Sequence, residues 1–323
     1  MLFWLQDIVE QWRVFPTITP PLPVVSIGGL TVGGSGKTPV TQALAHRCIE
    51  QGIVPGIILR GYRRRSRGTL VVSRGEGPEV PWELSGDEAW LHAWKLPQAI
   101  VVVDRHREVA SMAAWHLGAR IVLADDCFQY RRLRRQLELV LVDRRTLRRP
   151  YVIPFGPLRE PLSALRRAHA VLLNGIEPEE LPLFARHLPW IRVHFQHSGA
   201  MVWTPTGLQP LLSIPSEPVA AFAGIALPER FRQDLQESGW QLGLWRPFRD
   251  HYPYSRRVIR AFLTQCWDRG LRWAITTEKD IVRLQPLLPE FLSAGVTLVS
   301  VSLVAEFGEG SDSLWTLVDR LLQ

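Results

Sequence analysis

A glycine-rich segment near the start of the chain holds residues suited to binding phosphate. It reads Thr31-Val32-Gly33-Gly34-Ser35-Gly36-Lys37-Thr38 and lies between an apolar run and a helical pattern. Glycines let backbone N–H groups surround the β- and γ-phosphates of ATP, Lys37 supplies a positive charge, and the Thr38 hydroxyl can bind Mg²⁺. The N-terminus of the following helix also favours anions. The segment therefore predicts a phosphate-binding loop (P-loop) for ATP and Mg²⁺, with Thr31 in place of the motif's usual first glycine.

Two carboxylates that can serve a magnesium ion follow another apolar run. Asp125 and Asp126 end the run at residues 121–124. The carboxyl ends of parallel strands line the ligand crevice of a sheet, so both aspartates can share one edge with the P-loop. Paired aspartates are also common in turns and helix caps, and the local sequence leaves that alternative open.

Four further clusters hold charged residues. They are Gly86-Asp87-Glu88 at a helix start, Asp104-Arg105 after an apolar run, Leu158-Arg159-Glu160-Pro161 after a Gly-Pro pair, and Asp250-His251-Tyr252. Each also has a structural interpretation. Asp87 could simply cap its helix, the Arg159 segment could be a surface turn, and a lone histidine such as His251 is more often structural than catalytic.

These segments must be positioned by short β-branched runs that alternate with helical patterns. In the first half of the chain we expect strands at residues 24–30, 54–59, 99–103, 120–124, 137–142 and 170–173, and helices at residues 39–51, 87–96 and 107–117. Such alternation predicts an α/β fold with a P-loop NTPase-like parallel sheet and helices on both faces.

A second, shorter pattern follows a proline-rich stretch at residues 176–189, which indicates a nearby linker or boundary. Here we expect strands at residues 218–223, 273–277 and 296–304, and helices at residues 228–238, 255–269 and 312–322. This pattern predicts a second, smaller α/β domain.

Composition restricts the kind of partner and compartment. Hydrophobic residues make up 46% of the 323 residues and charged residues 21%, as in an ordinary folded protein. The formal net charge of +7 favours anionic partners, whether nucleic acid, a phospholipid surface or a phosphorylated substrate, but a merely basic soluble protein would carry the same charge, so charge alone does not choose among them. Three well-separated cysteines indicate no disulfide framework, and no apolar run is long enough to span a membrane.

The first fifteen residues form an amphipathic pattern with Trp4, Ile8 and Trp12 on its apolar side. Prolines at positions 16, 20, 21 and 23 end the predicted helix and form a stiff connector. The apolar side can either pack on the protein's own core or lie on a membrane surface, and both interpretations remain open.

The glycine-containing and charged segments together resemble one family over nearly the whole chain, the tetraacyldisaccharide 4′-kinases, or lipid A 4′-kinases. The matching segments are the P-loop, Leu59-Arg60-Gly61-Tyr62-Arg63-Arg64, Gly86-Asp87-Glu88, Asp104-Arg105, Asp125-Asp126 with Phe128-Gln129, Gly156-Pro157-Leu158-Arg159-Glu160-Pro161, Phe222-Ala223-Gly224-Ile225, Asp250-His251-Tyr252 and Thr277-Glu278-Lys279-Asp280. The family usually has Gly, His and Asp where this chain has Cys127, Tyr130 and Gln136.

This resemblance implies a role for each candidate residue. The residues implied in catalysis are Lys37, Asp87 and His251, with the last two as an acid–base pair. Those implied in ATP binding are all eight P-loop residues, Arg105, Gln129 and Arg159. Those implied as Mg²⁺ ligands are Thr38, Asp125, Asp126 and Glu160.

The resemblance also implies a domain plan. Residues 1–22 would form an amphipathic N-terminal helix and proline-rich connector, and residues 23–190 the P-loop kinase core domain. Residues 191–305 would form the smaller α/β domain, joined through a two-stranded linker, and residues 306–323 a C-terminal helix returning to the core.

The implied function is transfer of the γ-phosphate of ATP to the 4′-hydroxyl of tetraacyldisaccharide 1-phosphate, which gives lipid IVA in lipid A biosynthesis. The implied partners are this lipid A precursor and the anionic inner-membrane surface. The protein would lie peripherally on the cytoplasmic face of the membrane through its N-terminal helix. It would bind no nucleic acid and would need no obligate protein partner. Two alternatives stay open: a P-loop kinase for another anionic small molecule, and a nucleotide-binding homologue with reduced turnover.

Overall fold

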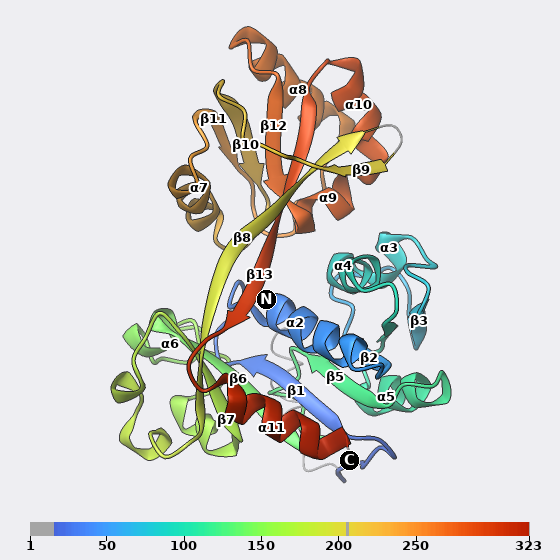
Figure 1. Ribbon diagram of the computed structural model, residues 1–323, viewed down its shortest axis with the longest axis vertical. Coiled ribbons are helices and arrows are strands. Elements are labelled where there is room, and N and C mark those ends of the chain that lie inside the picture. The colour runs from blue at the N-terminus through green and yellow to red at the C-terminus, as the bar shows by residue number, and fades with distance from the viewer. Residues whose placement is uncertain (1–15, 205–206, 323) are drawn as a thin grey trace. The chain divides into compact units, whose positions relative to one another are not determined.

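The computed structural model describes residues 16–204 and 207–322, and the predicted N-terminal helix lies outside them. The chain divides into two compact units (Figure 1). The first unit extends to Phe195 and resumes at Ala305, and the second comprises Gln196–Val304. Strands β8 (Trp190–Thr204) and β13 (Thr297–Phe307) each begin in one unit and end in the other.

The first unit contains a sheet whose strand order is β8-β7-β6-β1-β5-β2-β4-β3. Every neighbouring pair is parallel except β3 and β4, which are antiparallel. The strands are β1 (Val24–Gly29), β2 (Pro55–Leu59), β3 (Leu70–Arg74), β4 (Ile100–Val103), β5 (Ile121–Asp125), β6 (Leu137–Asp143) and β7 (Ala170–Asn174). Six of them were expected from their apolar runs, whereas β3 was not, because it is a short edge strand of mixed polarity.

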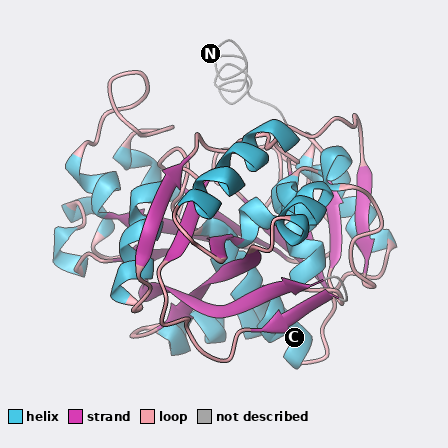
Figure 2. Cartoon of the chain, turned by 90° about the horizontal axis from the view of Figure 1, so that it is seen from above, coloured by secondary structure: helices cyan, strands magenta, loops and turns pink. Residues whose placement is uncertain are grey.

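Helices cover both faces of this sheet, as predicted, and Figure 2 distinguishes them from the strands by colour. On one face lie α2 (Lys37–Glu50), α4 (Asp87–Lys95) and α11 (Ser311–Leu322), and on the other lies α5 (Arg107–His116). Side chains along β5 alternate between the two faces of the sheet. Ile121 and Leu123 belong to the apolar cluster that includes α2, α4 and α11, whereas Val122 and Ala124 belong to the cluster that includes α5. Helix α11 also contacts α2 directly, with Arg47 lying 4.2 Å from the Trp315 ring centre.

Shorter elements complete the first unit. They are α3 (Trp82–Ser85), α6 (Arg144–Arg148) and the 3₁₀ turns Leu162–Arg167, Pro178–Glu180 and Leu183–Ala185. The proline-rich stretch near which a linker or boundary was expected belongs to this unit, because Ile176, Leu181 and Ala185 are buried in one of its apolar clusters. The unit continues to Phe195 because Ile191 and Val193 are buried in its core.

The second unit has a parallel sheet of order β11-β10-β12-β13, and β8 pairs antiparallel with β9 (Gly207–Pro210). Its other strands are β10 (Val219–Ala223), β11 (Leu242–Pro247) and β12 (Trp273–Thr277). Helices α7 (Pro228–Glu237) and α8 (Arg256–Asp268) pack on opposite faces of β10. The 3₁₀ turn Gln285–Leu287 separates α9 (Glu278–Leu284) from α10 (Leu288–Ser293).

None of the described helices has the length and apolar character needed to cross a membrane.

Candidate active site

The P-loop joins β1 to α2 and depends on its glycines for its backbone shape. Gly33, Gly34 and Gly36 have φ angles of 68°, 56° and 89°, in the left-handed region that favours glycine. Lys37 is the first residue of α2, and no side chain caps that helix N-terminus by a hydrogen bond within the described chain. The first N–H groups of α2 and the loop amides are thus suited to receive an anion.

The segment after Gly156, for which a surface turn was one interpretation, pairs with the beginning of the P-loop. Thr31 forms an isolated antiparallel bridge with Leu158. The N–H group of Val32 donates to the Pro157 carbonyl at 3.0 Å, and the N–H group of Arg159 donates to the Leu30 carbonyl at 2.6 Å. This pairing brings Arg159, which is more than a hundred positions further along the chain, to the phosphate-binding loop.

Three charged side chains meet beside the P-loop. The Lys37 ammonium lies 3.0 Å from the Ser35 hydroxyl and 3.6 Å from Oδ1 of Asp126. One guanidinium nitrogen of Arg159 lies 2.8 Å from each Asp126 carboxylate oxygen. Burial alone would raise the pKa of Asp126, but Arg159 and Lys37 outweigh it and hold that pKa well below its usual range. Two cations and an ionised carboxylate therefore converge where nucleotide phosphates would bind.

Asp126 also has an unusual backbone conformation. Its φ of 53° is in the left-handed region, which among the described non-glycine residues is otherwise occupied by Arg63 and His251. Backbone strain of this kind persists where the surroundings enforce it and is concentrated at functional sites. Asp126 and His251 were both predicted as site residues, and Arg63 belongs to the family-like segment after β2.

The neighbouring Asp125 has a different environment. Its Oδ2 lies 2.9 Å from Nε2 of His92, and both side chains are buried. Its Oδ1 and the His92 Nδ1 have no hydrogen-bond partner within the described part of the chain. His92, which the sequence analysis did not single out, links α4 to the end of β5. Asp125 is accordingly less suited than Asp126 to bind a phosphate-associated metal ion.

Glu160 and Gln129 make contacts that support the site. The Glu160 carboxylate binds Arg131, at 3.1 Å, through Oε1 and Arg167 through Oε2. The Gln129 side chain is buried and donates to the Gly29 carbonyl at 3.0 Å, which fixes the exit of β1. Both oxygens of Glu160 are thus engaged by arginines, so a metal-binding role for Glu160 would require an arginine to move and stays a prediction.

Asp87 and Arg105 emerge at the same edge of the first sheet as the P-loop. Strands β1, β5, β2 and β4 are parallel neighbours, and Arg105 lies just after β4. Gly86 packs so closely on the segment after β2 that a Cβ atom there would lie 2.9 Å from the Tyr62 carbonyl. Helix α4 therefore begins at this edge.

Asp87 does not occupy the N-cap position of α4, although the sequence alone allowed that role. Gly86 occupies the N-cap position of α4, and Asp87 is the first helical residue, with its Oδ1 accepting from the Glu88 N–H at 3.0 Å. The side chain of Asp87 is buried. Arg105 is exposed, and its carbonyl accepts from Arg107 at 2.8 Å. The roles of Asp87 in catalysis and of Arg105 in phosphate binding remain predictions.

The three departures from the family pattern have structural partners. Gln136 accepts a hydrogen bond from the Val24 N–H at 2.8 Å, which fixes the start of β1. The Tyr130 hydroxyl donates to Glu108, and its ring lies 5.0 Å from the Arg107 guanidinium. Cys127 is buried, and burial raises the pKa of its thiol to about 11. These residues stabilise the loop after β5.

His251 lies in the second unit, between β11 and α8. Its N–H group donates to the Gly224 carbonyl at 2.9 Å, and its Nε2 lies 3.9 Å from the Asp250 carboxylate. Because Asp87 belongs to the first unit and His251 to the second, their action as an acid–base pair stays a prediction.

The glycine-rich loop before α2, the parallel sheet and the cluster of Lys37, Asp126 and Arg159 define a P-loop phosphotransferase. A family model described as tetraacyldisaccharide-1-P 4′-kinase matches residues 2–323. The chain belongs to this family and is a kinase, as the sequence resemblance predicted.

Named relatives and one solved structure agree with this assignment. A tetraacyldisaccharide 4′-kinase of Pelodictyon phaeoclathratiforme is 35% identical over 300 residues, covering 87% of this chain and 82% of the relative. One of Chlorobium chlorochromatii is 37% identical over 293 residues, covering 85% and 78%. A crystal structure of LpxK from Aquifex aeolicus in complex with ATP is 29% identical, with a TM-score of 0.78, covering 100% of this chain and 95% of that one.

Proposed function

We propose that this protein transfers the γ-phosphoryl group of ATP to the 4′-hydroxyl of tetraacyldisaccharide 1-phosphate, giving lipid IVA for lipid A biosynthesis. The activity named for its relatives supports the acceptor, and the ATP complex of the Aquifex aeolicus protein supports the donor. The observation that carries the proposal is the meeting of Lys37, Asp126 and Arg159 beside the P-loop. Fixed charges around a transferring phosphoryl group are the main source of catalysis in this reaction class.

The residues present suit a magnesium ion that arrives with the nucleotide. Among the described residues no group of three or more His, Cys, Asp or Glu side chains could hold a metal ion alone. Protein-bound Mg²⁺ usually takes one or two carboxylates together with substrate phosphates, and Asp126 and the Thr38 hydroxyl offer such a set. When bound, Mg²⁺ would neutralise charge on the β- and γ-phosphates.

Each side chain has a distinct part in the proposed reaction. The P-loop amides and Lys37 bind the β- and γ-phosphates, and Arg159 stabilises negative charge on the transferred group. A sugar hydroxyl is a weak nucleophile, so Asp87, polarised by His251, accepts its proton as the new O–P bond forms. The γ-phosphorus to bridging-oxygen bond breaks, and ADP leaves with the electron pair of that bond.

We further propose that the protein works at an anionic membrane surface, where an acylated substrate resides. The loop at residues 151–155 exposes two aromatic side chains, with Tyr151 63% and Phe155 86% exposed. Arg148 and Arg149, just before them, are also exposed. Aromatic side chains beside arginines suit the boundary between lipid headgroups and acyl chains. The amphipathic sequence pattern of the first fifteen residues also supports binding to a membrane.

One assay tests the proposed function against its two alternatives. Purified protein is given ATP labelled at the γ-phosphate, with Mg²⁺, and with or without tetraacyldisaccharide 1-phosphate. We expect label to appear on the disaccharide, and only when the 4′-hydroxyl is free. Transfer to a different small anion alone would support another kinase, and nucleotide binding without transfer would support a homologue with reduced turnover.

A further inference from the structure

Two family-like segments, Phe222-Ala223-Gly224-Ile225 and Thr277-Glu278-Lys279-Asp280, have no part in the reaction as proposed above. Within the second unit they meet at Gly224, just after β10, and Asp280, in α9. The Gly224 N–H group lies 3.1 Å from each oxygen of the Asp280 carboxylate. The end of β10 is therefore tied to the first turn of α9 by a charge-assisted hydrogen bond.

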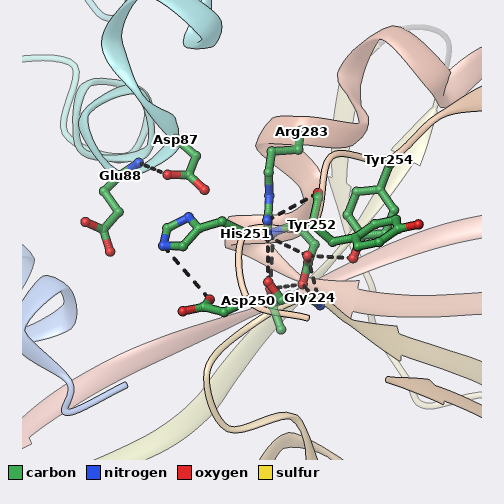
Figure 3. Close-up of polar contacts among 10 residues, drawn as sticks. Asp87, Glu88, Gly224, Asp250, His251, Tyr252, Tyr254 and Arg283 are labelled. Carbon is green, nitrogen blue, oxygen red and sulfur yellow. Dashed lines mark hydrogen bonds and ion pairs between the residues drawn. The ribbon is translucent and has the colours of Figure 1, made fainter. Parts of the chain in front are cut away.

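The carbonyl of the same glycine has two donors. It accepts from the His251 N–H at 2.9 Å and from the Arg283 guanidinium at 3.1 Å. Figure 3 shows Arg283 and the backbone of His251 on the same side of Gly224. Arg283 in turn donates to Oδ1 of Asp280 at 2.6 Å. One residue thus connects a buried ion pair to the backbone of the proposed catalytic histidine.

Only glycine fits at this junction. A Cβ atom at position 224 would lie 2.8 Å from the Tyr254 hydroxyl and 3.0 Å from Oδ1 of Asp280. Both distances are shorter than an ordinary van der Waals contact, so any side chain would push the hydrogen-bonded groups apart. The close approach accounts for glycine at this position of the segment.

The ion pair is enclosed and well supplied with partners. Asp280 is 0% exposed and Arg283 4% exposed. Asp280 also accepts from the Thr277 hydroxyl at 2.6 Å and the Tyr254 hydroxyl at 2.7 Å. Burial, and then the charge of Asp280, raise the pKa of Tyr254 far above its usual range, so its hydroxyl stays a donor. The Asp280 carboxylate thus accepts from four groups, namely the Gly224 amide, Tyr254, Thr277 and Arg283, which hold it in one position.

His251 has a backbone conformation that needs such support. Its φ of 52° lies in the left-handed region, which a non-glycine residue keeps only when its surroundings enforce it. The hydrogen bond from its N–H group to Gly224 is the contact through which the network acts.

We propose that the Asp280–Arg283 pair, acting through Gly224, holds His251 in the backbone geometry required for its proton-transfer role. This inference rests on the proposed function, in which His251 acts with Asp87. Asp280 and Arg283 are positioning residues, because neither is proposed to touch the substrate and both act through the backbone around His251.

A double-mutant cycle tests the proposal. Asp280→Asn keeps the shape of the side chain but removes the charge that holds Arg283 and the Gly224 amide. We expect kcat to fall by about 10- to 100-fold, as for a misplaced catalytic group. The KM for ATP should change by less than about twofold, because the P-loop is in the other unit. In a His251→Ala background, Asp280→Asn should cause no further loss of kcat.

Glu290→Gln is the matched control, since it also removes an ion-paired carboxylate from the second unit. Glu290 lies 2.7 Å from both Arg256 and Arg260, whose side chains are exposed, and its variant should retain wild-type kcat. Unchanged kcat in Asp280→Asn, or a further loss in the His251→Ala background, would overturn the positioning role. Unchanged kcat in His251→Ala itself would instead refute the acid–base role of the proposed function.

If Asp280→Asn does not fold, Tyr254→Phe takes its place in the double-mutant cycle. This change removes one hydrogen bond to Asp280 but leaves the ring packed 5.8 Å from that of Phe222. Its loss of kcat should be smaller and should again disappear when His251 is alanine. A loss of equal size in both backgrounds would contradict the proposal.

Discussion

The carboxylates of Asp125 and Asp126 are adjacent in sequence but have different environments. Asp126 points to Lys37 and Arg159, whereas Asp125 is buried against His92. Because the backbone of Asp126 is in the left-handed region, the side chains of the two aspartates point in different directions. A pair that sequence reasoning treats as equivalent metal ligands therefore becomes one residue facing Lys37 of the P-loop and one fixing the end of β5.

The pH dependence of stability should show the environment of Asp126. Its pKa is lower in the folded than in the unfolded chain, so folding releases protons from this group. Asp126 thus contributes stability above its unfolded pKa of about 4 and loses that contribution as the pH falls through the folded value. The difference in Tm between wild type and Asp126→Asn should be constant from about pH 8 to 5 and change below about pH 4. A change confined to the neutral range would contradict this assignment.

His92→Phe should destabilise the first unit, because it leaves the buried Asp125 carboxylate without its hydrogen-bond donor. The expected loss is about 1–3 kcal/mol in the free energy of unfolding, measured by denaturant titration. The matched control is His46→Phe, since the His46 side chain is 65% exposed and pairs with Glu50 on the surface. Equal effects of the two changes would show that the buried pair does not stabilise the unit.

At the scale of the elements, the sequence predicts most of what is buried. The apolar runs that became β1, β2, β4, β5, β6 and β7 are covered on both faces, which gives a clear pattern. Strands β3, β9 and β11 were missed because they are edge strands with exposed or polar positions.

The candidate site was only partly predictable for a related reason. The residue types were recognisable, but their partners lie far away in sequence, such as His92 33 positions from Asp125 and Arg131 29 positions from Glu160. No local sequence pattern predicts such pairs. The network around Gly224 was visible only as two segments without a role.

The membrane proposal belongs to this scale, because it concerns a loop and the first fifteen residues. Replacing Tyr151 and Phe155 by Ser, or Trp4, Ile8 and Trp12 by Ser, should reduce co-sedimentation with anionic vesicles, since each set supplies apolar side chains to the interface. Leu212→Ser, which alters a side chain that is 96% exposed in the second unit, is the control and should leave binding unchanged. Vesicle binding that survives both sets of changes would rule out these surfaces.

At the scale of the whole molecule, each unit contains one proposed catalytic residue. Asp87 begins α4 in the first, and His251 lies before α8 in the second. A reaction that needs both would occur only when the two units cooperate, which is a usual way to exclude water from phosphoryl transfer.

Asp87→Ala and His251→Ala should each lower kcat by about 10²- to 10⁴-fold while leaving ATP affinity nearly unchanged, since neither is proposed to bind the nucleotide. The double variant should be little worse than either single one, because residues acting as a unit give non-additive losses. Additive losses in steady-state kinetics would mean that the two residues act separately.

The central claim is that the P-loop beside Asp126 and Arg159 carries out phosphoryl transfer, and Lys37 tests it most directly. Transfer of labelled γ-phosphate to tetraacyldisaccharide 1-phosphate is measured for wild type, Lys37→Ala and the control Lys95→Ala, whose lysine ends α4. We expect Lys37→Ala to lose about 10²-fold or more of its kcat with its Tm nearly unchanged, because this charge acts on the phosphates and not in the core. The control should keep its activity. Full turnover by folded Lys37→Ala would contradict the account.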